Sequence, residues 1–118
     1  MSDHEKLQGY LTELRRGSLT LAVLGCLQTP HYGYALLQAL QERHVDIEAN
    51  TLYPLLRRLE SQGLLTSDWD TGESRPRKYY SRNAEGDRIL LALLGEWRTM
   101  QAHIEAICGK DESHEKLD

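Results

Sequence analysis

Residues 50–63 read NTLYPLLRRLESQG, with leucines at positions 52, 55, 56 and 59. This spacing of three and four residues gives a helix a single buried apolar stripe. The stripe predicts a helix over about 50–62, and Gly63 follows it, as glycine commonly does at a helix C-terminus. The opposite side of this helix carries the groups that stay free to bind a ligand: Asn50, Thr51, Tyr53, Arg57 and Arg58.

Two starting points for this helix are compatible with Pro54. If Thr51 caps the helix, the proline lies in the first turn, where its missing N–H has no helical partner to lose. If the helix begins near Glu48, the proline removes one backbone hydrogen bond and can bend the helix.

Two further helical regions precede this helix. Leucines recur at helical spacing between residues 7 and 27, where Gly17-Ser18 either breaks or bends the region and Thr29-Pro30 ends it. A second helix is predicted over about 32–43. The chain has 21 Leu against four Ile and two Val, with no Phe, which favours helices over sheet.

A hairpin and a long helix follow. Two strand-like runs, 64–70 and 77–82, flank a turn-rich segment and predict a β-hairpin. Asn83 can cap a last helix over 84–108, which Gly109 would end. This order of elements predicts a mostly α (α+β) fold, a winged helix-turn-helix with a long C-terminal helix. It would form one compact domain, with the winged region over 1–83 and a polar tail over 109–118.

Composition excludes several classes of protein. The 118 residues carry a net charge of −4, and no apolar run approaches the roughly 18 residues that span a membrane. The N-terminus lacks the pattern of a secretion signal, and two cysteines far apart indicate a reduced, cytoplasmic protein. Scattered histidines predict no metal or other cofactor. No nucleophile–base pair or phosphate-binding loop is recognisable, so we do not expect an enzyme.

Positive and negative charges are unevenly distributed along the chain. Residues 83–118 sum to −4, whereas residues 50–82 sum to +2. A helix about 10–12 Å wide fits the DNA major groove, and the basic hairpin beside it would follow the phosphate backbone. The sequence therefore predicts a DNA-binding module. A winged-helix protein–protein adaptor without specific DNA binding is the alternative, and salt-dependent binding to duplex DNA would separate the two.

Several motifs together resemble the PadR family of transcriptional regulators. The likeness covers about residues 7–108, and the combined Thr-Leu-Tyr-Pro and Arg-Lys-Tyr-Tyr signature is highly specific. The matching segments are TLYPLLRRLE at 51–60, GLL at 63–65, RKYY at 77–80 with Gly86 after it, RGSL at 16–19 and GY at 33–34. The chain departs from the family at Ser81-Arg82-Asn83, where Leu-Thr is usual, which suggests a different end of the wing.

The resemblance implies a prokaryotic, cytoplasmic, homodimeric repressor that binds an inverted-repeat operator. Such regulators often control detoxification or efflux genes and their own gene. The single C-terminal helix places the chain with the short members of the family.

The candidate DNA contacts lie in three groups. The recognition helix supplies the five polar residues named above. Tyr79 and Tyr80 alternate across their strand, so one faces the core and one the DNA side, with the assignment open. The wing candidates are Arg75, Arg77, Lys78 and Tyr79, and the candidate phosphate contacts are Arg16, Tyr32 and Gly33.

The last helix predicts a dimer. It is apolar on every side over 89–94, and one small domain covers only one face, so a partner subunit should cover the other. In short members of the family this helix lines a cleft for flat aromatic effectors; Trp97 is therefore a candidate effector contact, with plain interface packing as the alternative. Cys108 lies near the end of this helix and could form an inter-subunit disulfide. The predicted interface comprises Leu90, Leu93, Leu94, Trp97, Met100, Ile104 and Ile107.

Overall fold

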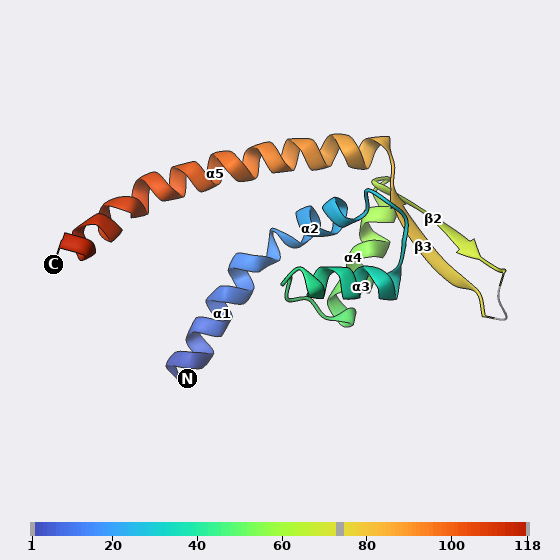
Figure 1. Cartoon of the computed structure of the whole chain (residues 1–118), viewed down its shortest axis with the longest axis horizontal. Helices are drawn as coiled ribbons and strands as arrows, with labels where there is room; N and C mark the ends of the chain where they lie inside the picture. The colour runs from blue at the N-terminus through green and yellow to red at the C-terminus, as the bar shows by residue number, and fades with distance from the viewer. Residues whose placement is uncertain (1, 73–74, 118) are drawn as a thin grey trace.

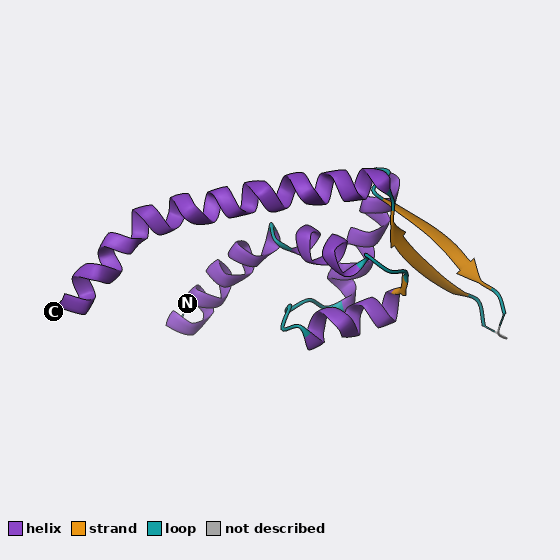
Figure 2. Ribbon diagram, turned by 45° about the horizontal axis from the view of Figure 1, so that its top comes forward, coloured by secondary structure: helices purple, strands orange, loops and turns teal. Residues whose placement is uncertain are grey.

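A computed structural model describes residues 2–72 and 75–117 of the chain, with side chains up to residue 109. The described part is mostly helical with one small sheet, as predicted (Figures 1 and 2). The elements in chain order are α1 (Asp3–Arg16), α2 (Leu19–Cys26), β1 (His31–Tyr32), α3 (Gly33–Glu42), α4 (Ala49–Ser61), β2 (Leu65–Asp70), β3 (Arg77–Arg82) and α5 (Ala84–Leu117).

The core lies where α2, α3 and α4 meet the sheet. All four leucines of the α4 stripe are buried in it, which confirms the helix predicted from their spacing. Tyr80 is the buried aromatic residue, with 6% of its surface exposed. The buried residues are Val23, Leu24, Leu27, Leu36, Leu40, Ile47, Leu52, Leu55, Leu56, Leu59, Leu64, Leu65 and Tyr80.

The sheet has three antiparallel strands in the order β1-β3-β2. The two hairpin strands agree with the predicted runs to within one residue. The prediction missed β1, and it wrongly placed Tyr32 in the second helix. Two residues are too short a strand to produce a periodic signal, and they become a strand only because Tyr32 pairs with Tyr79 of β3.

Two questions left open by the sequence are answered by the helix boundaries. Gly17-Ser18 separates α1 from α2, so the first region is broken into two helices. Helix α4 begins at Ala49 after its N-cap Glu48, which places Pro54 inside the helix. The proline therefore leaves the carbonyl of Asn50 without its helical partner.

Helix α5 begins as predicted and ends later. The Asn83 side-chain oxygen accepts a hydrogen bond from the Gly86 N–H at 2.9 Å, and its amide donates to the carbonyl of Gly63 at 3.0 Å. The predicted end at Gly109 is wrong, because the helix continues to Leu117. One glycine in a helix interior costs only about 1 kcal/mol, and the Lys, Asp and Glu residues that follow do not break the helix.

The chain is more extended than the single compact domain that its length suggests. Its radius of gyration is 18.0 Å and its extents are 64 × 35 × 22 Å. A compact domain of this length would have a radius of gyration of about 13–14 Å. The difference arises because α1 and α5 project away from the winged region (Figure 1). In the described part of the chain, no helix is both long and apolar enough to cross a membrane.

Candidate nucleic-acid interface

Helix α4 presents a polar face to solvent. Asn50, Thr51, Arg57 and Arg58 are all exposed, and the buried leucines hold the opposite side of the helix against the core. Asn50 and Arg57 are seven residues apart and lie on one line along the helix, as do Thr51 and Arg58. The two rows together form a polar surface two helical turns long, which could contact the edge of a DNA groove.

Tyr53 lies at the side of this face and is half-buried. Its ring packs against the start of α3, where a Cβ on Gly33 would lie 2.6 Å from the Tyr53 Cε1 atom. A side chain at position 33 would therefore force the Tyr53 ring to move. Because Gly33 is itself buried, this contact explains the residue without any phosphate.

The face of the wing that turns toward α4 is tied to that helix by Glu60. The Lys78 Nζ atom pairs with the Glu60 carboxylate at 3.1 Å, and the Ser67 hydroxyl donates to the same carboxylate. Lys78 also lies 5.1 Å from the centre of the Tyr80 ring. Lys78, which we predicted as a phosphate contact, therefore pairs with a carboxylate of its own chain, and this pairing positions the wing against α4.

The other face of the wing is held to β1. The Tyr32 hydroxyl donates to the Asp70 carboxylate at 2.5 Å, and this bond lowers the pKa of Asp70 and raises the pKa of Tyr32. The Arg77 guanidinium lies 4.1 Å from the centre of the Tyr32 ring, and Tyr79 meets that ring edge-on. Tyr79 is therefore the outward tyrosine of the pair, and Tyr80 is the core tyrosine.

Arg82 has a structural role in the described fold. Its Nη1 atom donates to the carbonyl of Leu24 at 2.7 Å, and its Nε atom pairs with Asp87 at 2.5 Å. The end of the wing is thereby fastened to α2 and to the first turn of α5. Arg82 belongs to the segment 81–83 at which the sequence departs from the family pattern.

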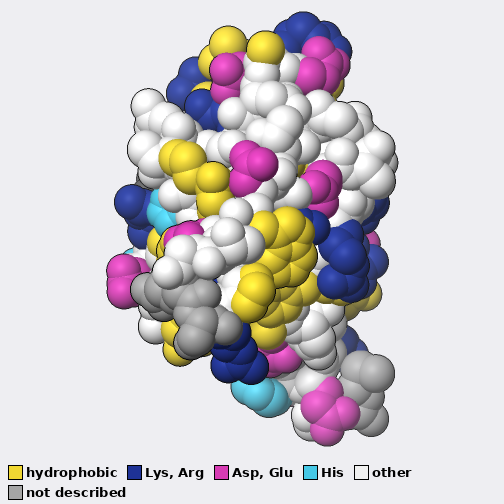
Figure 3. Space-filling model, turned by 90° about the vertical axis from the view of Figure 1, so that its right-hand side faces the viewer, with side chains coloured by type: hydrophobic (Ala, Val, Ile, Leu, Met, Phe, Trp, Pro, Cys, Tyr) yellow, Lys and Arg dark blue, Asp and Glu magenta, His cyan; other side chains and the backbone are white. Residues whose placement is uncertain are grey.

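These pairings reduce the number of basic groups available to DNA. In the described part of α4 and the wing, four arginines form no ion pair and are exposed: Arg57, Arg58, Arg75 and Arg77. Figure 3 looks onto the wing end of the molecule and shows Lys and Arg side chains flanking a group of hydrophobic ones. Arg16 is also exposed, at the C-terminal end of α1.

The predicted dimer residues divide into two sets. Leu90 packs against the core of its own chain, and Leu94 is half-buried. The remaining five are exposed, and the prediction missed three exposed apolar residues of α1, because a short helix of mixed character gave no reason to expect a partner. The exposed large apolar residues are Leu91, Leu93, Trp97, Met100, Ile104 and Ile107 on α5, of which Leu91 was not among those predicted, and Leu7, Tyr10 and Leu14 on α1.

Acid should weaken the contact between the wing and α4. The hydrogen bond from Ser67 and the pairing with Lys78 hold the pKa of Glu60 below its ordinary value of 4.5. A carboxyl whose folded pKa is lowered stabilises the fold fully above its unfolded pKa, and the stabilisation is lost as pH falls through the folded pKa.

We therefore expect the melting temperature of the native protein to fall more steeply than that of Glu60→Gln as pH drops from about 4.5 to about 3. Thermal unfolding followed by circular dichroism measures this, with Glu42→Gln on the exposed side of α3 as the control. Equal pH slopes for native protein and Glu60→Gln would contradict the assignment.

Fold and charge together define a winged-helix DNA-binding regulator. A family model described as the transcriptional regulator PadR-like family matches residues 21–92. The chain belongs to this family.

Several known proteins are similar to this chain over most of its length. The transcriptional regulator Rv3488 of Mycobacterium tuberculosis is 31% identical over 81 residues, which cover 68% of this chain and 76% of that protein. The crystal structure of a PadR family regulator from Eggerthella lenta has 47% identity and a TM-score of 0.85, covering 88% of this chain and 93% of the other. A PadR family regulator from Clostridium difficile has 27% identity and a TM-score of 0.70, covering 76% and 97%.

Proposed function

We propose that the protein is a homodimeric repressor that binds an inverted-repeat operator through α4 and the wing. The observation that carries this proposal is the exposed pair Arg57 and Arg58 on a helix that the wing flanks. Arginine forms bidentate hydrogen bonds with guanine, and Asn50 on the same face suits adenine. The proposed contacts to the DNA backbone are Arg75, Arg77 and Tyr79 of the wing and Arg16 of α1. The Tyr32 ring contacts the guanidinium of Arg77 and helps to hold it in place.

The dimer is supported by the apolar surface that α1 and α5 expose. Trp97, Met100 and Ile104 are 44%, 55% and 57% exposed, and they follow one another at helical spacing on one side of α5. A contiguous apolar stripe of this length is typical of an interface and would be unfavourable in water. A two-fold axis between the α5 helices would place two α4 helices on one duplex and make the operator a palindrome.

A charge on this stripe should separate the subunits. Ile104→Glu would bury a carboxylate in an apolar interface, and we expect the dimer dissociation constant to rise at least about tenfold. Sedimentation equilibrium measures the constant. Ala102→Glu introduces the same charge on the opposite, exposed side of α5 and should leave the dimer intact. An Ile104→Glu protein as dimeric as the native one would contradict the interface.

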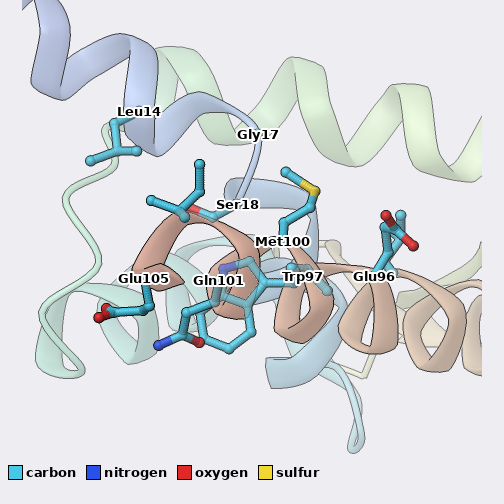
Figure 4. Close-up of a pocket in the computed structure, with 11 residues that line it drawn as sticks. Leu14, Gly17, Ser18, Glu96, Trp97, Met100, Gln101 and Glu105 are labelled. Carbon is cyan, nitrogen blue, oxygen red and sulfur yellow. The ribbon is translucent and has the colours of Figure 1, made fainter. Parts of the chain in front are cut away.

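A groove that this stripe lines on one side is the proposed effector site. It has a volume of about 410 Å³, within the usual range for small-molecule sites, and lies between the α1–α2 junction and α5. Figure 4 shows Leu14 and Ser18 on one side and Trp97 and Met100 on the other. The indole offers a flat face on which an aromatic molecule could stack, and binding there could change the spacing of the two α4 helices.

Trp97 fluorescence tests the effector proposal. In the variant Trp69→Phe, Trp97 is the remaining tryptophan and reports on the groove alone. We expect at least one member of a broad panel of planar aromatic compounds to quench this emission saturably and to lower the affinity for duplex DNA. Unchanged Trp97 emission with every compound of the panel would contradict the effector proposal.

A further inference from the structure

Most of the large apolar side chains exposed in the described part of the chain lie on α1 and α5, and the proposed dimer would cover those on α1 and on the Trp97 side of α5. Two lie elsewhere, and both belong to the winged region. They are Tyr34 at the start of α3 and Trp69 near the end of β2, which are 65% and 61% exposed. Trp69 has the larger apolar surface, and neither the core nor the dimer helices cover it.

Trp69 lies on the side of the wing that turns toward α4. Its partner across the sheet is Lys78, so the two side chains share one face. Ser67, two residues earlier on β2, lies on that face too, and both Ser67 and Lys78 contact Glu60 of α4. Trp69 therefore extends this face beyond Glu60 toward the tip, at the corner between the wing and the recognition helix.

The charges on this face of the wing permit a phosphate strand to lie against it. The opposite face carries Asp68 and Asp70 together with Arg77, one of the backbone contacts proposed above, so acidic and basic groups oppose each other there. Among the residues that the structure describes, the acid lying against the Trp69 face is Glu60, and Lys78 and Ser67 already neutralise and satisfy it. Arg57 lies one turn before Glu60 along α4 and is exposed, so positive charge lies beside Glu60 on the helix that this face meets.

We infer that Trp69 is a DNA-backbone contact of the wing. A helix about 10–12 Å wide in a major groove about 12 Å wide leaves a phosphate strand along each side of the helix. The strand on the Glu60 side of α4 has to pass the corner that Trp69 occupies. The indole can cover a deoxyribose with its apolar face and donate its Nε1–H to a phosphate oxygen. This inference rests on the proposed DNA-binding function and adds a residue to it.

The test compares Trp69→Ala with the native protein on duplexes of about 30 base pairs, long enough for two half-sites one turn apart. One duplex carries the sequence that the native dimer selects, and the other has a scrambled sequence. We expect Trp69→Ala to raise the dissociation constant about tenfold on both duplexes, because a backbone contact carries no sequence information. Asp68→Asn, a neighbour on the opposite face, should not weaken binding.

A second measurement follows the indole itself. In Trp97→Phe the remaining tryptophan is Trp69, and its quenching by acrylamide should fall when a duplex is bound. If duplex binds but both the quenching and the Trp69→Ala affinity are unchanged, the inference fails and the DNA-binding function stands. A loss confined to the selected duplex would overturn the backbone assignment. If native protein binds neither duplex at low salt, it is the proposed function that fails.

Discussion

Replacing Arg57 and Arg58 together with alanine is expected to weaken operator binding about a thousandfold. A bidentate arginine–guanine contact contributes about 1–3 kcal/mol. Two arginines in each of two subunits would lose at least about 4 kcal/mol, and each 1.4 kcal/mol is a factor of ten in affinity. Both side chains are exposed and form no ion pair within the described chain, so the fold should not depend on them.

Fluorescence anisotropy with the selected duplex measures the loss, and sedimentation shows whether the dimer persists. Arg98→Ala is the control, because it removes an exposed positive charge from α5, away from α4. A change of less than about tenfold in the double variant, with the dimer intact, would mean that α4 does not read the operator through this pair.

Gly86→Ala is expected to destabilise the fold by about 3 kcal/mol, at the upper end of the usual cost of overpacking. A Cβ at this position would lie 2.3 Å from the carbonyl oxygen of Leu64 and 2.7 Å from the Arg82 Cγ atom. The carbonyl belongs to the backbone at the start of the wing and cannot move aside alone. The first turn of α5 would therefore have to shift away from the wing and from its Asn83 cap.

Thermal unfolding at a fixed protein concentration measures this effect, and the melting temperature should fall by about 10 °C. Gly95→Ala is the matched control in the same helix, because nothing lies within 4 Å of its Cβ position. That change should be neutral or stabilising by up to about 1 kcal/mol. Equal melting temperatures for Gly86→Ala and native protein would contradict the close approach of α5 to the wing.

The elements that the sequence predicted well are those with local signals. The α4 stripe, the two hairpin strands and the Asn83 cap each depend on residues within a few positions of one another. The two-residue β1 and the continuation of α5 past Gly109 had no such signal. A strand of two residues exists only through its partner, and a single glycine in a helix is a weak stop.

The candidate site was predicted less completely, because charge in a sequence does not show which charges are paired. Arg75, Arg77, Lys78 and Arg82 formed one basic run, yet Lys78 pairs with Glu60 and Arg82 with Asp87. Those partners lie 18 and 5 residues away along the chain, and the fold alone brings Glu60 beside the wing. The sequence alone also did not show that Trp69 is exposed, because its exposure depends on the strand register and the direction of the wing.

Selection from a pool of random-sequence duplexes tests the central claim most directly. The native protein is incubated with the pool at low and at physiological salt, and the bound duplexes are recovered and sequenced. The account predicts an inverted repeat whose half-sites lie about one helical turn apart, with affinity that falls steeply as salt rises. A folded protein that enriches no sequence over the starting pool would contradict it.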